Sequence, residues 1–145
     1  MEKIRAKKVN MTQIFLDSGI VEPTTLVVLE DTQGSTLKEG DLVTVSGISK
    51  GKGFQGVVKR HGFAGGPRTH GQKHSEREPG SIGGGGRAGG RVVKGMRMAG
   101  RMGGERVTVK NLRILKIVPE SKEVYISGAI PGRRGSSLEV RKLVS

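Results

Sequence analysis

Hydrophobic and polar residues alternate in short runs toward both ends of the chain, which is the pattern of strands half-buried in a β-sheet. These runs are rich in valine, isoleucine, leucine and threonine, and turn residues such as Glu39-Gly40-Asp41 and Pro131-Gly132 separate them. No segment shows a convincing helical period. The pattern predicts five strands: Thr24 to Glu30, Leu42 to Ile48, Arg106 to Val118, Glu123 to Ile130 and Ser137 to Lys142.

The alternation changes phase within the long run that contains Asn111. Val107 and Val109 are odd-numbered apolar positions, whereas Leu112 and Ile114 are even-numbered. A strand changes phase in this way at a bulge or where it bends between two sheets, so we predict one of these features at Asn111. Short strands with no helices to cover a sheet are best explained by a small antiparallel β-barrel, closed or nearly closed, and we therefore expect a mostly β fold.

The middle of the chain has a different composition. Residues 50–104 hold twelve basic and two acidic side chains, a net charge of +10 out of the chain's +13, and 18 of the 25 glycines. Glycine loses the most backbone entropy on ordering, and the few apolar side chains there cannot offset that loss. We therefore predict a barrel made of residues 1–49 and 105–145, and an extension, residues 50–104, that is poorly ordered alone and takes its shape from a partner. The alternative, a flexible linker, does not usually carry so much charge.

The charge of the extension favours a polyanionic partner. A membrane interaction would need an amphipathic helix or an apolar run of about 18 residues, and the sequence has neither. Residues 1–8 lack the apolar region of a signal peptide, and the absence of cysteine suits a reducing cytoplasm. Nucleic acid is thus the predicted partner, because arginine and lysine bind phosphate oxygens and glycine lets the backbone approach them closely.

Two known binding motifs are suggested by the sequence, and neither is supported by its context. The stretch Gly51 to Gly56 fits the dinucleotide fingerprint G-x-G-x-x-G, but that fingerprint works through a helix N-terminus. Five glycine and proline residues between positions 62 and 71 are expected to prevent that helix. Lys52-Gly53-Phe54 begins like the RNA-recognition-module signature, yet the later positions lack its aromatics. A nucleotide-dependent enzyme is therefore a distant alternative.

Three histidines in the extension, His61, His70 and His74, could bind a metal or RNA. The last two are four residues apart, a spacing that makes them neighbours only on a helix. RNA contact is the better explanation, since the histidines lie among arginines and lysines, and we expect no metal and no cofactor.

The two acids of the extension, Glu76 and Glu78, are expected to pair locally with Arg77 or Lys73. The sequence offers no paired carboxylates or activated nucleophile in a supporting context. We therefore predict that the protein is not an enzyme and has no small-molecule substrate.

An ordered set of motifs resembles one known family. The motifs are Lys7 to Phe15, Ser49 to Arg60, His70-Gly71, Pro79 to Gly83 and Met98 to Val109. Together they strongly resemble ribosomal protein L-three of the bacterial type. The resemblance implies a translation-protein-type β-barrel on the large ribosomal subunit and an extension that enters the 23S-type rRNA towards the peptidyl transferase centre. It also implies binding near the 3′ end of that rRNA, an early role in assembly, neighbouring ribosomal proteins as partners, and a cytoplasmic location in the ribosome.

The candidate rRNA-binding residues are the cations and histidines of the extension, one aromatic residue, and the arginine that follows. They are Lys50, Lys52, Phe54, Lys59, Arg60, His61, Arg68, His70, Lys73, His74, Arg77, Arg87, Arg91, Lys94, Arg97, Arg101 and Arg106. The resemblance also implies that Pro79, Gly80, Ser81, Ile82 and Gly83 lie near the innermost turn of the extension. The alternative is a free RNA chaperone, which would bind unrelated RNAs almost equally well.

Three features depart from the family pattern. The chain lacks several dozen residues that members usually carry between the N-terminal hairpin and Ser49. In those members the residues form part of the surface domain. Asn10 stands where glycine is usual, an exchange that asparagine tolerates if the site needs a positive φ. Gly84 stands about where many bacterial members have a methylated glutamine, so we expect no such modification here.

Overall fold

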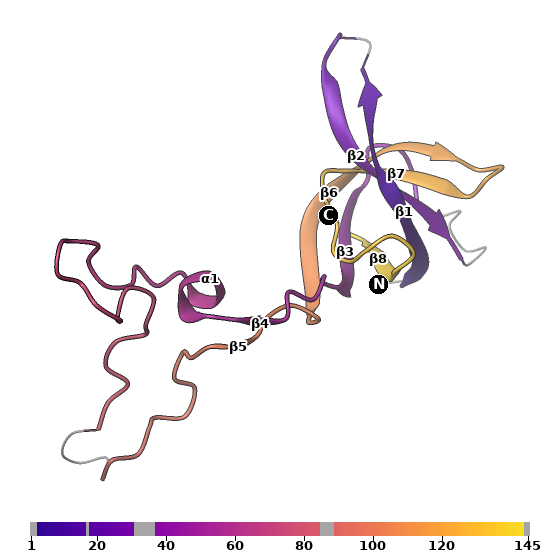
Figure 1. Ribbon diagram of the computed structural model, residues 1–145. Coiled ribbons are helices and arrows are strands. Elements are labelled where there is room, and N and C mark those ends of the chain that lie inside the picture. The colour runs from indigo at the N-terminus through magenta and orange to yellow at the C-terminus, as the bar shows by residue number, and fades with distance from the viewer. Residues whose placement is uncertain (1–2, 17, 31–36, 85–88, 144–145) are drawn as a thin grey trace. The chain divides into compact units, whose positions relative to one another are not determined.

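The computed structural model describes residues 3–16, 18–30, 37–84 and 89–143 (Figure 1). The chain divides into two compact units, residues 1–50 with 104–145 and residues 51–103. Within the described ranges it forms eight strands and one short helix. In chain order these are β1 (Ile4–Phe15), β2 (Val21–Leu29), β3 (Leu42–Ile48), β4 (Phe54–Gln55), α1 (Val57–His61), β5 (Gly100–Arg101), β6 (Arg106–Val118), β7 (Glu123–Ser127) and β8 (Ser137–Lys142).

Six strands of the first unit close into one antiparallel ring in the order β1-β2-β7-β6-β3-β8, the topology of a closed barrel. The ring closes at β1, where Ala6 lies opposite Leu29 of β2 on one side and Leu138 of β8 on the other. Strands β1 and β2 continue beyond the ring as a hairpin, and their pairing runs on to Phe15 opposite Val21 (Figure 1). The predicted mostly β fold is confirmed.

The core of the ring consists of aliphatic side chains of moderate size that point inward from alternate strand positions. Each valine, leucine or isoleucine among them contributes about 1.5–3 kcal/mol when fully buried. No aromatic side chain belongs to this core in the described part of the chain, in keeping with the low aromatic content. The strand residues of the core are Ile4, Ala6, Val27, Leu29, Val43, Val45, Ile114, Val124, Ile126, Leu138 and Val140.

All five predicted strands are present, and β3, β6 and β8 have the predicted bounds. Strand β2 begins three residues earlier than predicted, and β7 ends at Ser127 instead of continuing to residue 130. The chain leaves the sheet at Gly128, whose N–H donates to the Pro23 carbonyl (2.8 Å) and whose carbonyl accepts the Thr25 hydroxyl (2.7 Å).

The irregularity predicted at Asn111 is confirmed. Val43 of β3 lies opposite Leu112, whereas Val45 lies opposite Val109, so β6 carries one extra residue at this point. Asn111 itself has a φ of 59°. The partner of β6 also changes close to the bulge, because β6 pairs with β3 as far as Arg113 and with β7 from Ile114 on.

Strand β1 is absent from the set of strands predicted from the alternation. Charged residues occupy its outward positions, so the N-terminal run reads as polar: Arg5 and Lys7 are exposed, while Ile4 and Ala6 are buried. The inward face then continues with a lysine instead of an apolar residue, which further hides the alternation.

That lysine, Lys8, is only 8% exposed. Its amino group donates to the carbonyl oxygens of Ile130 (2.7 Å) and Gly132 (3.0 Å), and burial together with the charge of Lys50 lowers its pKa. The buried cation is stabilised because two carbonyls replace its water shell. Lys8 therefore ties β1 to the loop between β7 and β8.

Asn10 lies just beyond a register shift in β1. The non-glycine residues with positive φ in the described part of the chain are Asn111 and Lys122, so a positive φ does not explain asparagine at position 10. Its side-chain oxygen is buried and has no hydrogen-bond partner among the residues that the structure describes.

Replacing the buried lysine, Lys8→Met, should lower the free energy of unfolding by about 1–3 kcal/mol, because two buried carbonyls lose their donor. The matched change Lys7→Met removes an exposed cation from the adjacent position and should stay within about 0.5 kcal/mol. Urea denaturation of both variants checks this. Equal losses in the two variants would show that the hydrogen bonds of Lys8 contribute nothing specific.

Candidate nucleic-acid interface

The second unit begins and ends with a short β-ladder. Phe54 of β4 lies opposite Arg101 of β5, and the pairing is extended by hydrogen bonds from the Lys52 N–H to the Met102 carbonyl and from the Met102 N–H to the Gly53 carbonyl, both 2.9 Å. Phe54 is 72% exposed, and Lys52 and Arg101 are exposed as well. Candidate residues from two distant segments, Lys52 and Phe54 from the first and Arg101 from the second, therefore lie on one ladder.

Helix α1 follows directly, although the downstream glycines were expected to prevent a helix. The glycines limit its length instead, because α1 ends at Gly62 after five residues. One turn gives a much weaker dipole than the long helix beneath a dinucleotide pyrophosphate.

No helix in the described part of the chain is long and apolar enough to cross a membrane.

Arg60 and His61 face inward within this unit. The Arg60 guanidinium donates to the Met98 carbonyl (2.7 Å), and the His61 Nε2 lies 2.9 Å from the same oxygen. A methyl group on Gly100 would lie 2.7 Å from the Arg60 guanidinium, so this side chain packs directly on β5. These two candidates hold α1 against the returning chain and are less available to RNA than their neighbours.

A closed loop follows between Gly65 and Glu76. The Gly66 N–H donates to the Glu76 carbonyl (2.9 Å), and a methyl group on Gly65 would lie 2.1 Å from that carbonyl oxygen. Only glycine permits so close an approach of two backbones. The loop presents four exposed candidate residues, Arg68, His70, Lys73 and His74, and the exposed Arg77 follows it directly.

Glu76 pairs with Arg68 at 2.5 Å. Glu76 does not pair with Lys73 or Arg77, which were the expected partners of the two acids. Both side chains of the observed pair are largely exposed, 75% for the arginine, so the pair contributes little to stability. Arg68 is nevertheless partly neutralised, unlike the other cations of this loop.

The remaining candidates lie along the second half of the unit. Arg91 and Lys94 are exposed, and the Arg97 guanidinium lies over the Phe63 ring at 5.1 Å. Arg87 lies outside the described residues. Pro79 and Gly80, expected near the innermost turn, line a cavity of about 520 Å³ together with Phe63. Ser81 and Gly83 are exposed, and Ile82 is half-buried.

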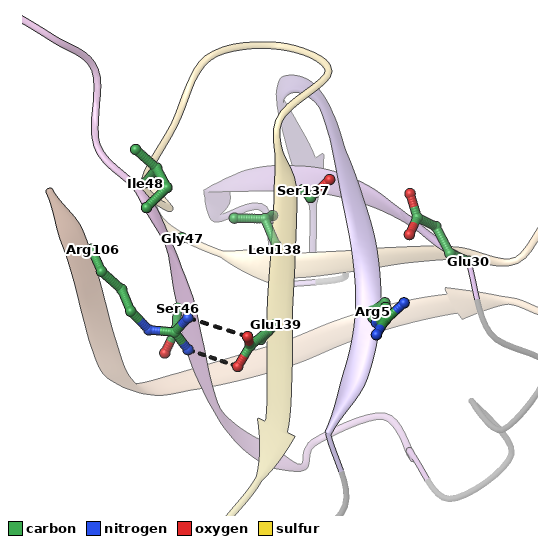
Figure 2. A pocket seen from close by; sticks show the side chains of 9 residues that line it. All are labelled: Arg5, Glu30, Ser46, Gly47, Ile48, Arg106, Ser137, Leu138 and Glu139. Atoms are coloured by element: carbon green, nitrogen blue, oxygen red, sulfur yellow. Dashed lines mark hydrogen bonds and ion pairs between the residues drawn. The ribbon is translucent and has the colours of Figure 1, made fainter. Parts of the chain in front are cut away.

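Two candidates, Lys50 and Arg106, belong to the first unit. Arg106 donates to both carboxylate oxygens of Glu139 (3.2 and 2.7 Å), as Figure 2 shows at a cavity of about 340 Å³. This pairing raises the pKa of Arg106 and lowers that of Glu139 from 4.5 to about 2. Arg5 and Glu30 also line the cavity, which therefore carries charges of both signs and does not suit a polyanion. Arg106 is engaged within the ring, whereas Lys50 is exposed.

The described residues contain no group of three or more histidine, cysteine or acidic side chains placed to hold a metal ion.

The Arg106–Glu139 pair should stabilise the ring in a pH-dependent way. Because the folded-state pKa of Glu139 is depressed, its contribution is complete above about pH 4.5 and is lost as the pH falls towards 2. The coupling energy between Arg106 and Glu139 should therefore be present at neutral pH and vanish near pH 2. Thermal unfolding measures it on four proteins: the unmodified chain, Arg106→Gln, Glu139→Gln and the double variant. A coupling energy that does not change with pH would rule out this ion pair as its source.

The contact of Arg60 with Met98 should order the first turn of the second unit. Arg60→Gln should reduce the hydrogen-exchange protection of the Gly62 and Met102 amides by about tenfold, since a charge-assisted hydrogen bond contributes about 1.5 kcal/mol or more. Lys59→Gln, which changes an exposed neighbour, should leave protection unchanged. Equal protection in both variants, measured by NMR, would contradict this role of Arg60.

Comparison with known proteins identifies the family. Residues 4–128 match the family model of ribosomal protein L3. The chain is 56% identical over 105 residues to large ribosomal subunit protein uL3 of Chlorobium limicola, covering 72% of this chain and 50% of that protein. It is 51% identical over 120 residues to uL3 of Chlorobaculum tepidum (79% and 57%) and 51% identical over 115 residues to uL3 of Leifsonia xyli (79% and 52%). The chain thus spans about half the length of the curated relatives it matches, and it belongs to the ribosomal protein L3 family.

Proposed function

We propose that this chain is a non-enzymatic structural component of the large ribosomal subunit that binds 23S-type rRNA near its 3′ end. Its relatives are named large ribosomal subunit proteins, which supports this assignment. In this proposal the ring is the translation-protein-type surface domain, and residues 50–104 form the extension that reaches towards the peptidyl transferase centre. The chain acts early in subunit assembly, in the cytoplasm, beside other ribosomal proteins.

The observation that carries the proposal is the difference in charge pairing between the two units. Four cations of the ring, Arg106, Arg113, Arg141 and Lys142, form ion pairs with acids of the ring. In the second unit the one ion pair among the described residues is that of Arg68. Most cations of that unit are therefore exposed without a counter-charge, and a polyanion supplies the missing negative charge.

The residues of the extension suit close contact with folded RNA. Exposed lysines and arginines neutralise phosphates, and arginine can take two phosphate oxygens at once. The exposed ring of Phe54 offers a surface on which a base can stack. These groups position RNA elements around the catalytic centre, and the catalysis belongs to the RNA.

The affinity of the purified chain for a transcript of the 3′ domain of its large-subunit rRNA tests this function, with a scrambled RNA of equal length as the control. If six to ten phosphates are neutralised, the plot of log affinity against log salt should have a slope of roughly −4 to −9. A preference for the rRNA that persists at high salt is the expected result. Equal binding to both RNAs, lost in parallel as salt rises, would favour the free RNA chaperone instead.

A further inference from the structure

A second group of cations lies outside the extension, on a glycine turn between β7 and β8. The turn runs Pro131-Gly132-Arg133-Arg134-Gly135-Ser136, and both of its arginines are exposed. Gly132 and Gly135 have φ values of 92° and 79°, so left-handed residues bracket the two arginines. The sequence shows these two arginines between turn glycines, but the candidate residues were chosen mainly from the extension because most of the net charge lies there.

The turn is fixed by hydrogen bonds at both ends. The Ser136 hydroxyl and N–H both donate to the Arg133 carbonyl, at 2.7 and 3.2 Å. The Gly135 N–H donates to the Lys8 carbonyl (2.7 Å), and the Lys8 N–H donates to the Ser136 carbonyl (3.0 Å). The buried Lys8 amino group holds the Gly132 carbonyl from below. A turn fixed in this way has already lost the conformational entropy that a flexible loop would lose on binding.

Close steric contacts restrict the conformation of this turn. A methyl group on Gly132 would lie 2.2 Å from the Ser136 hydroxyl and 3.2 Å from the Ile48 carbonyl. The turn therefore packs against the last residue of β3, two positions before the exposed Lys50. Arg133 and Arg134 are carried on a rigid support next to the end of the ring where β3 leaves it.

Neither guanidinium of the turn has an ion-pair or hydrogen-bond partner among the described residues. Elsewhere on the ring, Arg113 pairs with Glu22, while Arg106 and Arg141 pair with Glu139. Acids of the ring thus neutralise those three arginines and leave Arg133 and Arg134 with free donors. Two adjacent free guanidinium groups on a rigid turn suit phosphate oxygens, which arginine binds in pairs.

We propose that the Arg133-Arg134 turn is a pre-formed binding site for the phosphate backbone of structured RNA, separate from the extension. This inference rests on the proposed function and adds to it a contact made by the ring itself. Phosphate contacts fix orientation and carry little sequence information. The turn therefore sets how the ring lies on the RNA, while the extension makes the deeper contacts.

The test compares two double variants of the full chain on the 3′-domain transcript. Arg133→Gln/Arg134→Gln should make the slope of the salt dependence shallower by about 1.4–1.8 and weaken binding roughly 10- to 50-fold at about 0.1 M salt, since each lost phosphate contact removes about 0.7–0.9 from the slope. Lys110→Gln/Lys116→Gln removes the same charge from exposed positions of β6 and should weaken binding by less than about threefold. Because the side chains of the turn arginines have no ion-pair or hydrogen-bond partner among the described residues, both proteins should unfold at nearly the same temperature.

A conservative variant separates geometry from charge. Arg133→Lys/Arg134→Lys keeps both charges but loses the planar fork, so it should restore the salt slope and only part of the affinity. If the two glutamine variants weaken binding equally, the turn has no special role and the inference is wrong. If the unmodified chain itself fails to prefer the rRNA over the scrambled control, the proposed function is wrong; preference without any effect of the turn variants refutes this inference alone.

Discussion

Neutralisation of charge decides which parts of this chain can fold into a packed sheet. The ring contains enough acids to pair several of its cations, so its strands can close over an aliphatic core. The segment 50–104 has twelve basic and two acidic residues and cannot do this. Its cations repel one another and stay at the surface, which leaves short elements joined by glycine-rich chain. In the proposed function a polyanionic partner removes this repulsion, and the cations that have no ion pair among the described residues make the contacts.

The ring supplies what the extension lacks, which is a rigid support. Closure depends on β1, whose inward face ends in the buried Lys8. By holding the carbonyls of Ile130 and Gly132, this lysine shapes the turn that carries Arg133 and Arg134. The buried Lys8 thus contributes both to the packing of the ring and to the shape of the turn that exposes Arg133 and Arg134. In the proposed function the two units bind RNA in different ways, the ring through a pre-formed turn and the extension through a chain rich in glycine.

Local patterns account for what could be predicted from the sequence. Alternation marked five strands, and a change of phase located the bulge at Asn111, because both depend only on neighbouring residues. Strand β1 escaped prediction because the groups that satisfy Lys8 lie more than 120 residues away. The same limit applies to the candidate site. Residue type singled out Arg60, His61 and Arg106 as candidates, but their partners Met98 and Glu139 are set by tertiary structure and could not be predicted from local sequence. Helix α1 was not predicted, because the glycines that follow it were expected to prevent a helix. They end the helix after five residues instead.

Sedimentation of the epitope-tagged chain with ribosomes from the cells that produce it tests whether the chain has a fixed place in the large subunit. A structural component of the large subunit should sediment with that subunit, at about one copy per particle, and stay there after a wash at about 1 M salt, where the Debye length shrinks to about 3 Å and exposed charges alone no longer hold a protein. Release of the chain into the free fraction by the same wash, or its equal distribution over both subunits, would contradict a fixed place in the large subunit.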